Sequence, residues 1–180
     1  MKRILVPLAD GFEEIEAVTI IDVLRRAGLR VITAGLTTRL VSGAHEVVIQ
    51  ADTLLSEVKD LDFDAVILPG GMPGTTNLQE NQNVIHILKR LDSEGRWVGA
   101  ICAAPTVLKS AGVIRDRQVT SYPAFQEDLS AFDYRQDRVV VDEHLVTSRG
   151  PGTALEFSLR LVSLLAGTEK ADELAKGMIV

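Results

Sequence analysis

The sequence predicts an α/β protein with a doubly wound, mostly parallel sheet that carries helices on both faces. Short apolar runs typical of buried strands alternate with amphipathic helical patterns along most of the chain. The first forty residues hold a complete strand–helix–strand unit, which implies two parallel strands joined by a crossover helix. No repeat, low-complexity segment or linker interrupts the pattern, so residues 1–180 are expected to form a single domain.

The first half of the chain begins with an apolar run over residues 3–9, which predicts the first strand. A helix is expected over residues 12–27, because Glu13 and Glu14 suit its positive end and Gly28 is a natural stop. The segments that follow are assigned in order to a strand at 30–36, a hairpin within 37–50, a short helix over 53–59, a buried strand at 65–68 and a helix over 84–93.

The second half contains shorter elements. Thr153 is predicted to cap a helix that runs to Leu165, with Glu156 completing a capping box, and Gly167 ends that helix. The remaining elements are assigned to a strand that ends at Cys102, a helix from Pro105, strands at 118–121, 138–141 and 144–147, and a last helix over 168–176.

Composition excludes several classes of protein. The hydrophobic share of 46% and the charged share of 24% are ordinary for a soluble globular chain. The net charge of −6 favours neither nucleic acid nor an anionic membrane as a partner, and no apolar run is long enough to span a bilayer. The single cysteine excludes an internal disulfide and a multi-cysteine metal site. It fits a reducing compartment, so a cytoplasmic location is expected.

Cys102 ends an apolar strand of mostly small residues and stands just before a helix. Pro105 suits the first turn of that helix, where its missing N–H costs nothing. A thiol at this turn lies beside unpaired backbone N–H groups, which favour the thiolate. Cys102 is therefore a candidate nucleophile with a lowered pKa. The alternative is a core cysteine, because free cysteine is often buried as a small hydrophobe.

Ligands bind at the carboxyl ends of the strands in such sheets. Three loops are expected to meet there: the turn at residues 10–11, the loop at 69–74 and the turn at Cys102. The glycine-rich loop at 69–74 matches neither a P-loop nor the dinucleotide fingerprint. Its double glycine, Gly70 and Gly71, lets backbone N–H groups approach a neighbouring reactive atom. The amides of Gly71 and Ala103 are thus candidates for an oxyanion hole. A plain turn after a buried strand is the alternative.

Glu16 lies on a helical stripe with Ile20, Val23 and Ala27 and is its only polar member. A carboxylate on a buried stripe should have a raised pKa and an engaged partner. The helix begins at the sheet edge where Cys102 is expected, so Glu16 is a candidate to share a proton with that thiol. The alternative is an exposed glutamate on a helix with a wider polar face.

The three histidines lie far from the cysteine in the sequence. His86 falls in an ordinary amphipathic helix and His144 just before a strand, so both are expected at the surface. His45 lies in the hairpin loop and is a candidate for the edge of a pocket.

The first predicted helix is apolar on a second side, where Ile15, Val18, Ile21 and Leu24 lie. One sheet cannot bury both sides, so a homodimer is expected.

Taken together, these segments resemble the ThiJ/PfpI family, the superfamily of the parkinsonism-associated cysteine protein. The resemblance extends over nearly the whole chain. It is most specific in the segments at 10–17, 25–28, 68–71, 100–105 and 147–153. It implies a flavodoxin-like sandwich, a homodimer and an easily oxidised cysteine at Cys102. It further implies a protonated glutamate at Glu16.

The resemblance also implies a set of site residues. Backbone groups at Gly70, Gly71 and Ala103 would bind the reacting group. Further candidates for the pocket are Glu13, Tyr122, Arg26 and His45. Many members of the family carry a histidine where this chain has Tyr122. Tyrosine donates a hydrogen bond but is a poor base near neutral pH, which weighs against a protease-type Cys–His pair.

Two functions follow as hypotheses. In the first, the chain is a glyoxalase or deglycase that acts on methylglyoxal or its protein adducts and protects against carbonyl and oxidative stress. Cys102 would add to the aldehyde, and Glu16 would move the proton, with no metal or organic cofactor. In the second, the chain is a redox-sensing chaperone whose cysteine is oxidised to the sulfinate. A glutamine amidotransferase is less expected, because no His-x-Glu pair begins at His144.

Overall fold

The computed structural model describes residues 1–180, and its centre is a seven-stranded sheet in the order β10-β11-β7-β6-β1-β2-β5. Every neighbouring pair in this sheet is parallel except β10 and β11. The strands are β1 (Arg3–Leu8), β2 (Arg30–Gly35), β3 (Leu40–Ser42), β4 (Val48–Gln50), β5 (Thr53–Leu54), β6 (Ala65–Leu68), β7 (Trp97–Ile101), β8 (Gln118–Val119), β9 (Asp133–Tyr134), β10 (Val139–Asp142) and β11 (Leu145–Ser148).

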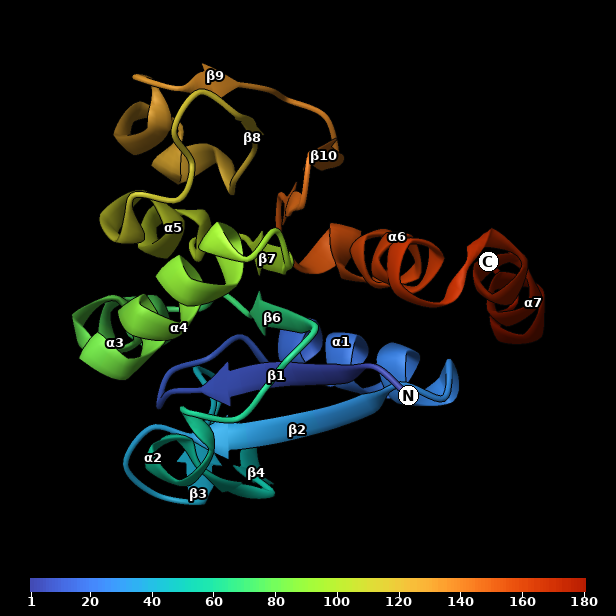
Figure 1. The fold of residues 1–180 in the computed structure, drawn as a ribbon, viewed down its shortest axis with the longest axis horizontal. Coiled ribbons are helices and arrows are strands. Elements are labelled where there is room, and N and C mark those ends of the chain that lie inside the picture. Colours follow the sequence, from blue (N-terminus) through green and yellow to red (C-terminus); the bar gives the residue numbers. More distant parts are fainter.

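Helices cover both faces of the sheet, with α3, α4 and α5 on one side and α1, α6 and α7 on the other (Figure 1). The helices are α1 (Glu14–Arg26), α2 (Leu55–Val58), α3 (Gly74–Glu80), α4 (Gln82–Ser93), α5 (Pro105–Ala111), α6 (Ala154–Ala166) and α7 (Thr168–Met178), with 3-10 turns at Pro123–Phe125, Glu127–Leu129 and Pro151–Thr153. This arrangement confirms the predicted doubly wound fold class. No helix combines the length and apolar character needed to cross a bilayer.

The hydrophobic core lies in two layers, one on each face of the sheet. Successive side chains of a strand point to opposite faces, so Leu5 of β1 joins one layer while Ile4 and Val6 join the other. A strand buried on both faces has no polar side, which explains the continuous apolar runs in the sequence.

The strand order places three loops at one edge of the sheet. After β1 the chain moves outward to β2 and β5, then returns to the other side of β1 as β6. The carboxyl ends of β1, β6 and β7 therefore lie side by side at the point where the winding reverses. Backbone hydrogen bonds join the first two loops, because Glu13 N–H donates to Gly70 O at 2.9 Å and Gly74 N–H donates to Gly11 O at 3.2 Å.

One element was missed and one local prediction is wrong. The segment 74–80 forms helix α3, where the sequence analysis assigned no element. Thr153 and Glu156 form no capping box, because a 3-10 turn precedes α6 and occupies the threonine hydroxyl. Thr153 Oγ1 bonds to Gly150 and to Ser148 Oγ, while Glu156 accepts from Arg138 at 2.6 Å.

His144 is less exposed than expected. Its side chain is 18% exposed, and Nε2 lies 2.8 Å from Asp92 Oδ1. The Asp92 carboxylate is 1% exposed and also bonds to the guanidinium groups of Arg115 and Arg117. A buried charge is paired because unpaired burial is costly, so His144 belongs to a network that joins α4 to the start of β11. His86 is exposed, as predicted.

The second apolar side of helix α1 is exposed at two residues and buried at the other two. Ile15 is 57% and Val18 48% exposed, whereas Ile21 and Leu24 are buried within this chain against the core. Only the first two residues are thus left uncovered, fewer than the sequence pattern indicated.

Candidate active site

Cys102 occupies a sharp turn between β7 and α5. Its φ of 65° lies in the left-handed region, which is uncommon for a residue with a side chain. The surrounding chain holds this conformation, since Cys102 N–H donates to Ser148 O at 3.0 Å and Cys102 O accepts from Tyr122 N–H at 2.8 Å. Backbone strain of this kind concentrates at functional sites.

Gly70 brings the loop after β6 directly against the cysteine. A Cβ atom at position 70 would lie 2.7 Å from Cys102 Cβ and 2.8 Å from Glu16 Oε2, closer than real contacts allow. Gly71, with a φ of 90°, sits against the backbone of Glu13 in the same way. The double glycine is therefore required by close approach of three segments, which a plain turn would not need.

Glu16 is fully buried beside these glycines. Its Oε2 accepts a hydrogen bond from Gly70 N–H at 2.8 Å, while Oε1 has no hydrogen-bond partner of ordinary length. Burial raises the pKa of Glu16 to about 7, against the opposing effects of Gly70 N–H and the Cys102 thiol. The predicted buried carboxyl with a raised pKa is confirmed, and the alternative of an exposed glutamate is wrong. The Gly70 amide thus holds the carboxyl and is not free for an oxyanion.

The thiol of Cys102 does not have the lowered pKa that the sequence analysis expected. Burial and the adjacent Glu16 carboxylate raise the pKa of Cys102 to about 12. The N–H groups of Ala103 and Gly71 donate toward the sulfur and lower the pKa, but by less than burial and the carboxylate raise it. The expectation failed because it counted the amides and omitted the negative charge next to them.

Two groups that interact this strongly titrate as a pair. Loss of the first proton leaves either a thiol beside a Glu16 carboxylate or a Cys102 thiolate beside a protonated Glu16. The amides of Ala103 and Gly71 stabilise the second form, which is the nucleophile. The first proton leaves near the pKa of Glu16, so the thiolate form becomes available near neutral pH. In that form Glu16 is protonated, so the unfavourable state with both groups ionised is not needed.

The other pocket candidates divide between two places. The Glu13 side chain is 14% exposed, and its charge contributes to the raised pKa of Glu16. His45 lies close to Glu13, with Nδ1 3.8 Å from Glu13 Oε2. Arg26 is not near Cys102 within this chain. It ends helix α1, at the opposite end from Glu16, and pairs with Asp22 at 2.8 Å.

Tyr122 lines a pocket of about 360 Å³, and its backbone N–H donates to Cys102 O at 2.8 Å. Its ring lies against Gly150, where a Cβ atom would be 3.2 Å from the ring. The same pocket is lined by Arg138 and Arg149, which the sequence analysis did not single out. The strand pattern could have indicated Arg149, because it lies in the loop at 148–153, which follows the strand that pairs with β7.

The chain was compared with known proteins. The family model for DJ-1/PfpI matches residues 2–164. Protein dj-1beta of Drosophila melanogaster is 46% identical over 99% of this chain and 97% of its own length, and its crystal structure matches with a TM-score of 0.97. Glutathione-independent glyoxalase DJR-1.2 of Caenorhabditis elegans is 41% identical over 96% of this chain and 92% of its own length.

Some relatives are longer. The chain spans 47% of Protein DJ-1 homolog A of Arabidopsis thaliana, to which it is 42% identical over 99% of its own length. The residues matched by the family model include the Cys102 turn, the double glycine and Glu16. Because the family model covers most of the chain and full-length relatives exceed 40% identity, this protein belongs to the DJ-1/PfpI family.

Proposed function

We propose that the protein is a cysteine-dependent glyoxalase or deglycase that converts methylglyoxal, or its adducts on proteins, to lactate. The observation that carries the proposal is the pairing of Cys102 with a fully buried Glu16 whose pKa is raised to about 7. A general acid–base group works best when its pKa lies near the working pH. The relative DJR-1.2, whose name is Glutathione-independent glyoxalase, supports the same reaction class.

The first step is addition of the sulfur to the aldehyde. The Cys102 thiolate, beside protonated Glu16, forms a C–S bond to the aldehyde carbon, and the carbonyl π electrons move to oxygen. The amides of Gly71 and Ala103, which donate toward the sulfur in the free protein, lie where the developing oxyanion needs donors. Glu16 then gives its proton to that oxygen, which leaves a hemithioacetal and a Glu16 carboxylate.

The second step moves a hydrogen between carbons. Glu16 removes the proton from the former aldehyde carbon, and the ketone becomes an enediolate. The hydroxyl proton passes from the first oxygen to the second, and Glu16 returns the carbon-bound proton to the second carbon. The product is a lactoyl thioester on Cys102. Water hydrolyses this thioester to lactate and the free thiol, so methylglyoxal and one water are consumed for each lactate. The transfer is an internal redox exchange and requires no external oxidant.

A redox-sensing chaperone is the second candidate. Cys102 is partly exposed, and amides directed at its sulfur would also hold the oxygens of a sulfinate. Among the similar structures is Toxoplasma gondii DJ-1 in an oxidised form, with 37% identity and a TM-score of 0.97. In this role Glu16 serves as a hydrogen-bond donor, and no proton has to be carried in each cycle.

The test measures lactate formed from methylglyoxal by wild type, Cys102→Ser and Glu16→Gln. Glu16→Gln should lower turnover by about 10²- to 10⁴-fold, the usual contribution of a general acid–base group. The same three proteins are analysed by intact mass after mild peroxide. Glutamine keeps an N–H donor, so Glu16→Gln should still gain two oxygens.

The results separate the two candidates. An enzyme loses turnover in both variants while Glu16→Gln keeps its oxidation. If wild type forms no lactate, or if Glu16→Gln turns over as wild type does, the enzyme proposal is wrong. Oxidation in wild type and Glu16→Gln without any turnover would leave the sensor as the function.

A further inference from the structure

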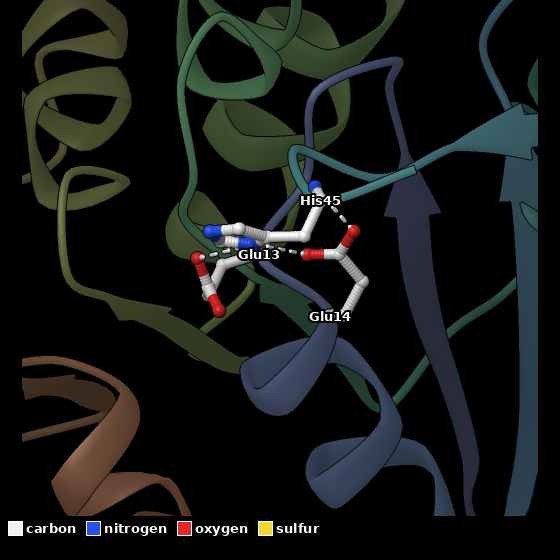
Figure 2. A group of neighbouring side chains, drawn as sticks. All are labelled: Glu13, Glu14 and His45. Carbon is white, nitrogen blue, oxygen red and sulfur yellow. Dashed lines mark hydrogen bonds and ion pairs between the residues drawn. The ribbon is translucent and has the colours of Figure 1, made fainter. Parts of the chain in front are cut away.

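A pocket of about 190 Å³ lies between α3, α5 and the two 3-10 turns at Pro123–Phe125 and Glu127–Leu129. Helices α3 and α5 cover the face of the sheet opposite α1 (Figure 1). None of the residues that line the pocket belongs to α1 or to the loop of His45, where the charged side chains of Figure 2 lie. The pocket is therefore separate from the apolar residues of α1 that a second copy is expected to cover. The proposed reaction uses none of its side chains.

Two walls of the pocket continue from the segments that hold the cysteine sulfur. Met72 directly follows Gly71, whose N–H donates toward the sulfur. Thr106 Oγ1 donates to Ala103 O at 2.8 Å, and the N–H of Ala103 is the other donor to the sulfur. The pocket is thus built by tertiary structure next to the candidate active site.

Thr75 on α3 lines the pocket with a hydroxyl that has no partner. Its side chain is buried, since the residue is only 2% exposed. The backbone N–H of Thr75 donates to Gly71 O at 2.9 Å, but Oγ1 forms no hydrogen bond. Buried hydroxyl groups are normally paired, because leaving one unpaired costs free energy. A polar ligand in the pocket would give this hydroxyl the partner that the chain does not supply.

Hydroxyl groups also dominate the rest of the polar wall. Thr76, Thr106 and Ser110 add three hydroxyls, and Gln79 adds a side-chain amide. A hydroxyl donates one hydrogen bond and accepts two, and an amide both donates and accepts. Such a wall matches ligand groups that themselves donate and accept, as alcohols do.

The charges of the wall favour neither an anion nor a cation. Lys109 and Asp128 carry opposite charges, and Lys109 Nζ already donates to the backbone carbonyl of Asp128 at 2.6 Å. Met72, which is 50% exposed, and Phe125 supply the apolar surface. The carbon atoms of a neutral ligand can pack on these two side chains.

We propose that this pocket binds a small neutral ligand with hydroxyl groups on successive carbons, of the polyol or sugar class. One ligand hydroxyl pairs with Thr75 Oγ1, others pair with the remaining polar wall, and the carbon chain packs on Met72 and Phe125. A phosphate would face the Asp128 carboxylate, and a diamine would face the Lys109 ammonium. The pocket is smaller than the roughly 300–1,000 Å³ of drug-sized sites, so the ligand is short.

The test is a titration of the full chain with erythritol, followed by the chemical shifts of the backbone amides. Erythritol is a four-carbon polyol without a carbonyl group, so it cannot react with Cys102. The amide shifts of Thr75, Thr76 and Lys109 should change and saturate. Butane-1,4-diol has the same length but lacks the two inner hydroxyls, and it should bind at least about threefold more weakly.

Two variants and a matched control assign the binding to the pocket. Thr75→Val keeps the shape of the side chain and should weaken erythritol binding by about three- to tenfold. It removes a buried group without a partner, so its thermal midpoint should not fall. Ser110→Phe, at an exposed position, should fill the pocket and abolish binding. Thr120→Val is the control, because Thr120 Oγ1 is also buried and unpaired but does not line this pocket, and the affinity should stay unchanged.

Several results would overturn the proposal. They are the absence of saturable shifts in wild type, equal affinity for the diol and erythritol, and erythritol binding in Thr75→Val as tight as in wild type. Tighter binding of inorganic phosphate or 1,4-diaminobutane than of erythritol would also overturn it. None of these outcomes depends on glyoxalase turnover, so failure here is distinct from failure of the proposed function.

Discussion

At the scale of single residues, Glu16 determines how stability depends on pH. Its pKa is about 7 in the folded protein and 4.5 when exposed, so the folded state holds the proton more tightly. The contribution to the free energy of unfolding is fully present below about pH 4.5 and is lost as the pH rises through about 7. A shift of this size corresponds to roughly 3 kcal/mol at most.

The check is a set of urea denaturation curves for wild type and Glu16→Gln across that range. Wild type should lose stability relative to the variant as the pH rises, because glutamine cannot ionise. Parallel pH profiles for the two proteins would show that Glu16 does not ionise within the fold with a raised pKa.

Gly70 provides a second prediction at this scale. Gly70→Ala should destabilise the fold by about 1–3 kcal/mol and abolish lactate formation, because the new methyl group displaces Cys102 or Glu16. Gly152→Ala is the matched control, since nothing lies within 4 Å of a Cβ atom there. Equal activity of the two variants would contradict the close approach of the three segments.

The sequence predicted these site residues unevenly. Glu16 stood out because one acid interrupted an apolar stripe, and Cys102 because small residues surrounded it at a strand end. The raised pKa of Cys102 was missed, since it depends on the carboxylate of Glu16 and on burial, both set by tertiary packing. Arg26 was a candidate through the family resemblance, and within this chain it lies at the end of α1 opposite Glu16.

At the scale of elements, the buried Asp92 joins α4 to the segments just before β8 and β11. Burial acts to raise the pKa of Asp92, but hydrogen bonds from Arg117 and His144 and the charges of Arg117 and Arg115 lower it overall. Asp92→Asn should cost about 3–5 kcal/mol, because Arg117, only 4% exposed, loses its carboxylate partner.

Asp22→Asn is the matched control for that loss. It breaks the exposed pair with Arg26 and should cost less than about 1 kcal/mol. Thermal or urea unfolding of both variants gives the comparison. A cost for Asp92→Asn as small as that of the control would show that the network does not tie these elements together.

Most elements could be predicted from the sequence, because the spacing of apolar residues and the positions of glycine and proline agree with the fold. Strand β6 has the predicted bounds, since a four-residue apolar run ends at Pro69 and Gly70. Helix α3 was missed because glycine, threonine and asparagine dominate its sequence, and its start depends on contacts with the loop after β1. The capping box failed because the 3-10 turn before α6 takes the Thr153 hydroxyl.

At the scale of the whole molecule, the topology explains why distant segments form one site. Residues 16, 70 and 102 meet because β1, β6 and β7 are neighbours in the sheet. The alternation of elements predicted a parallel sheet, but the strand order follows from the structure. The sequence therefore indicated which loops carry chemistry and left their exact contacts to tertiary packing.

The assembly state is a prediction at this scale. We expect a homodimer that covers Ile15 and Val18, the exposed apolar residues of α1. Ile15→Glu with Val18→Glu should yield a monomer in light scattering, while Leu61→Glu, at an exposed apolar residue elsewhere, should not. A monomeric wild type at micromolar concentration would contradict the expectation.

The most direct test of the Cys102–Glu16 pair is the rate of iodoacetamide alkylation of Cys102 as a function of pH, followed by intact mass. In wild type the rate should rise with a midpoint near 7 and then level off, because the thiolate forms together with a protonated Glu16. In Glu16→Gln that step should vanish, and the rate should keep rising into the alkaline range. A wild-type midpoint at roughly 8.5, the ordinary value for cysteine, or identical profiles in the two proteins, would contradict the account.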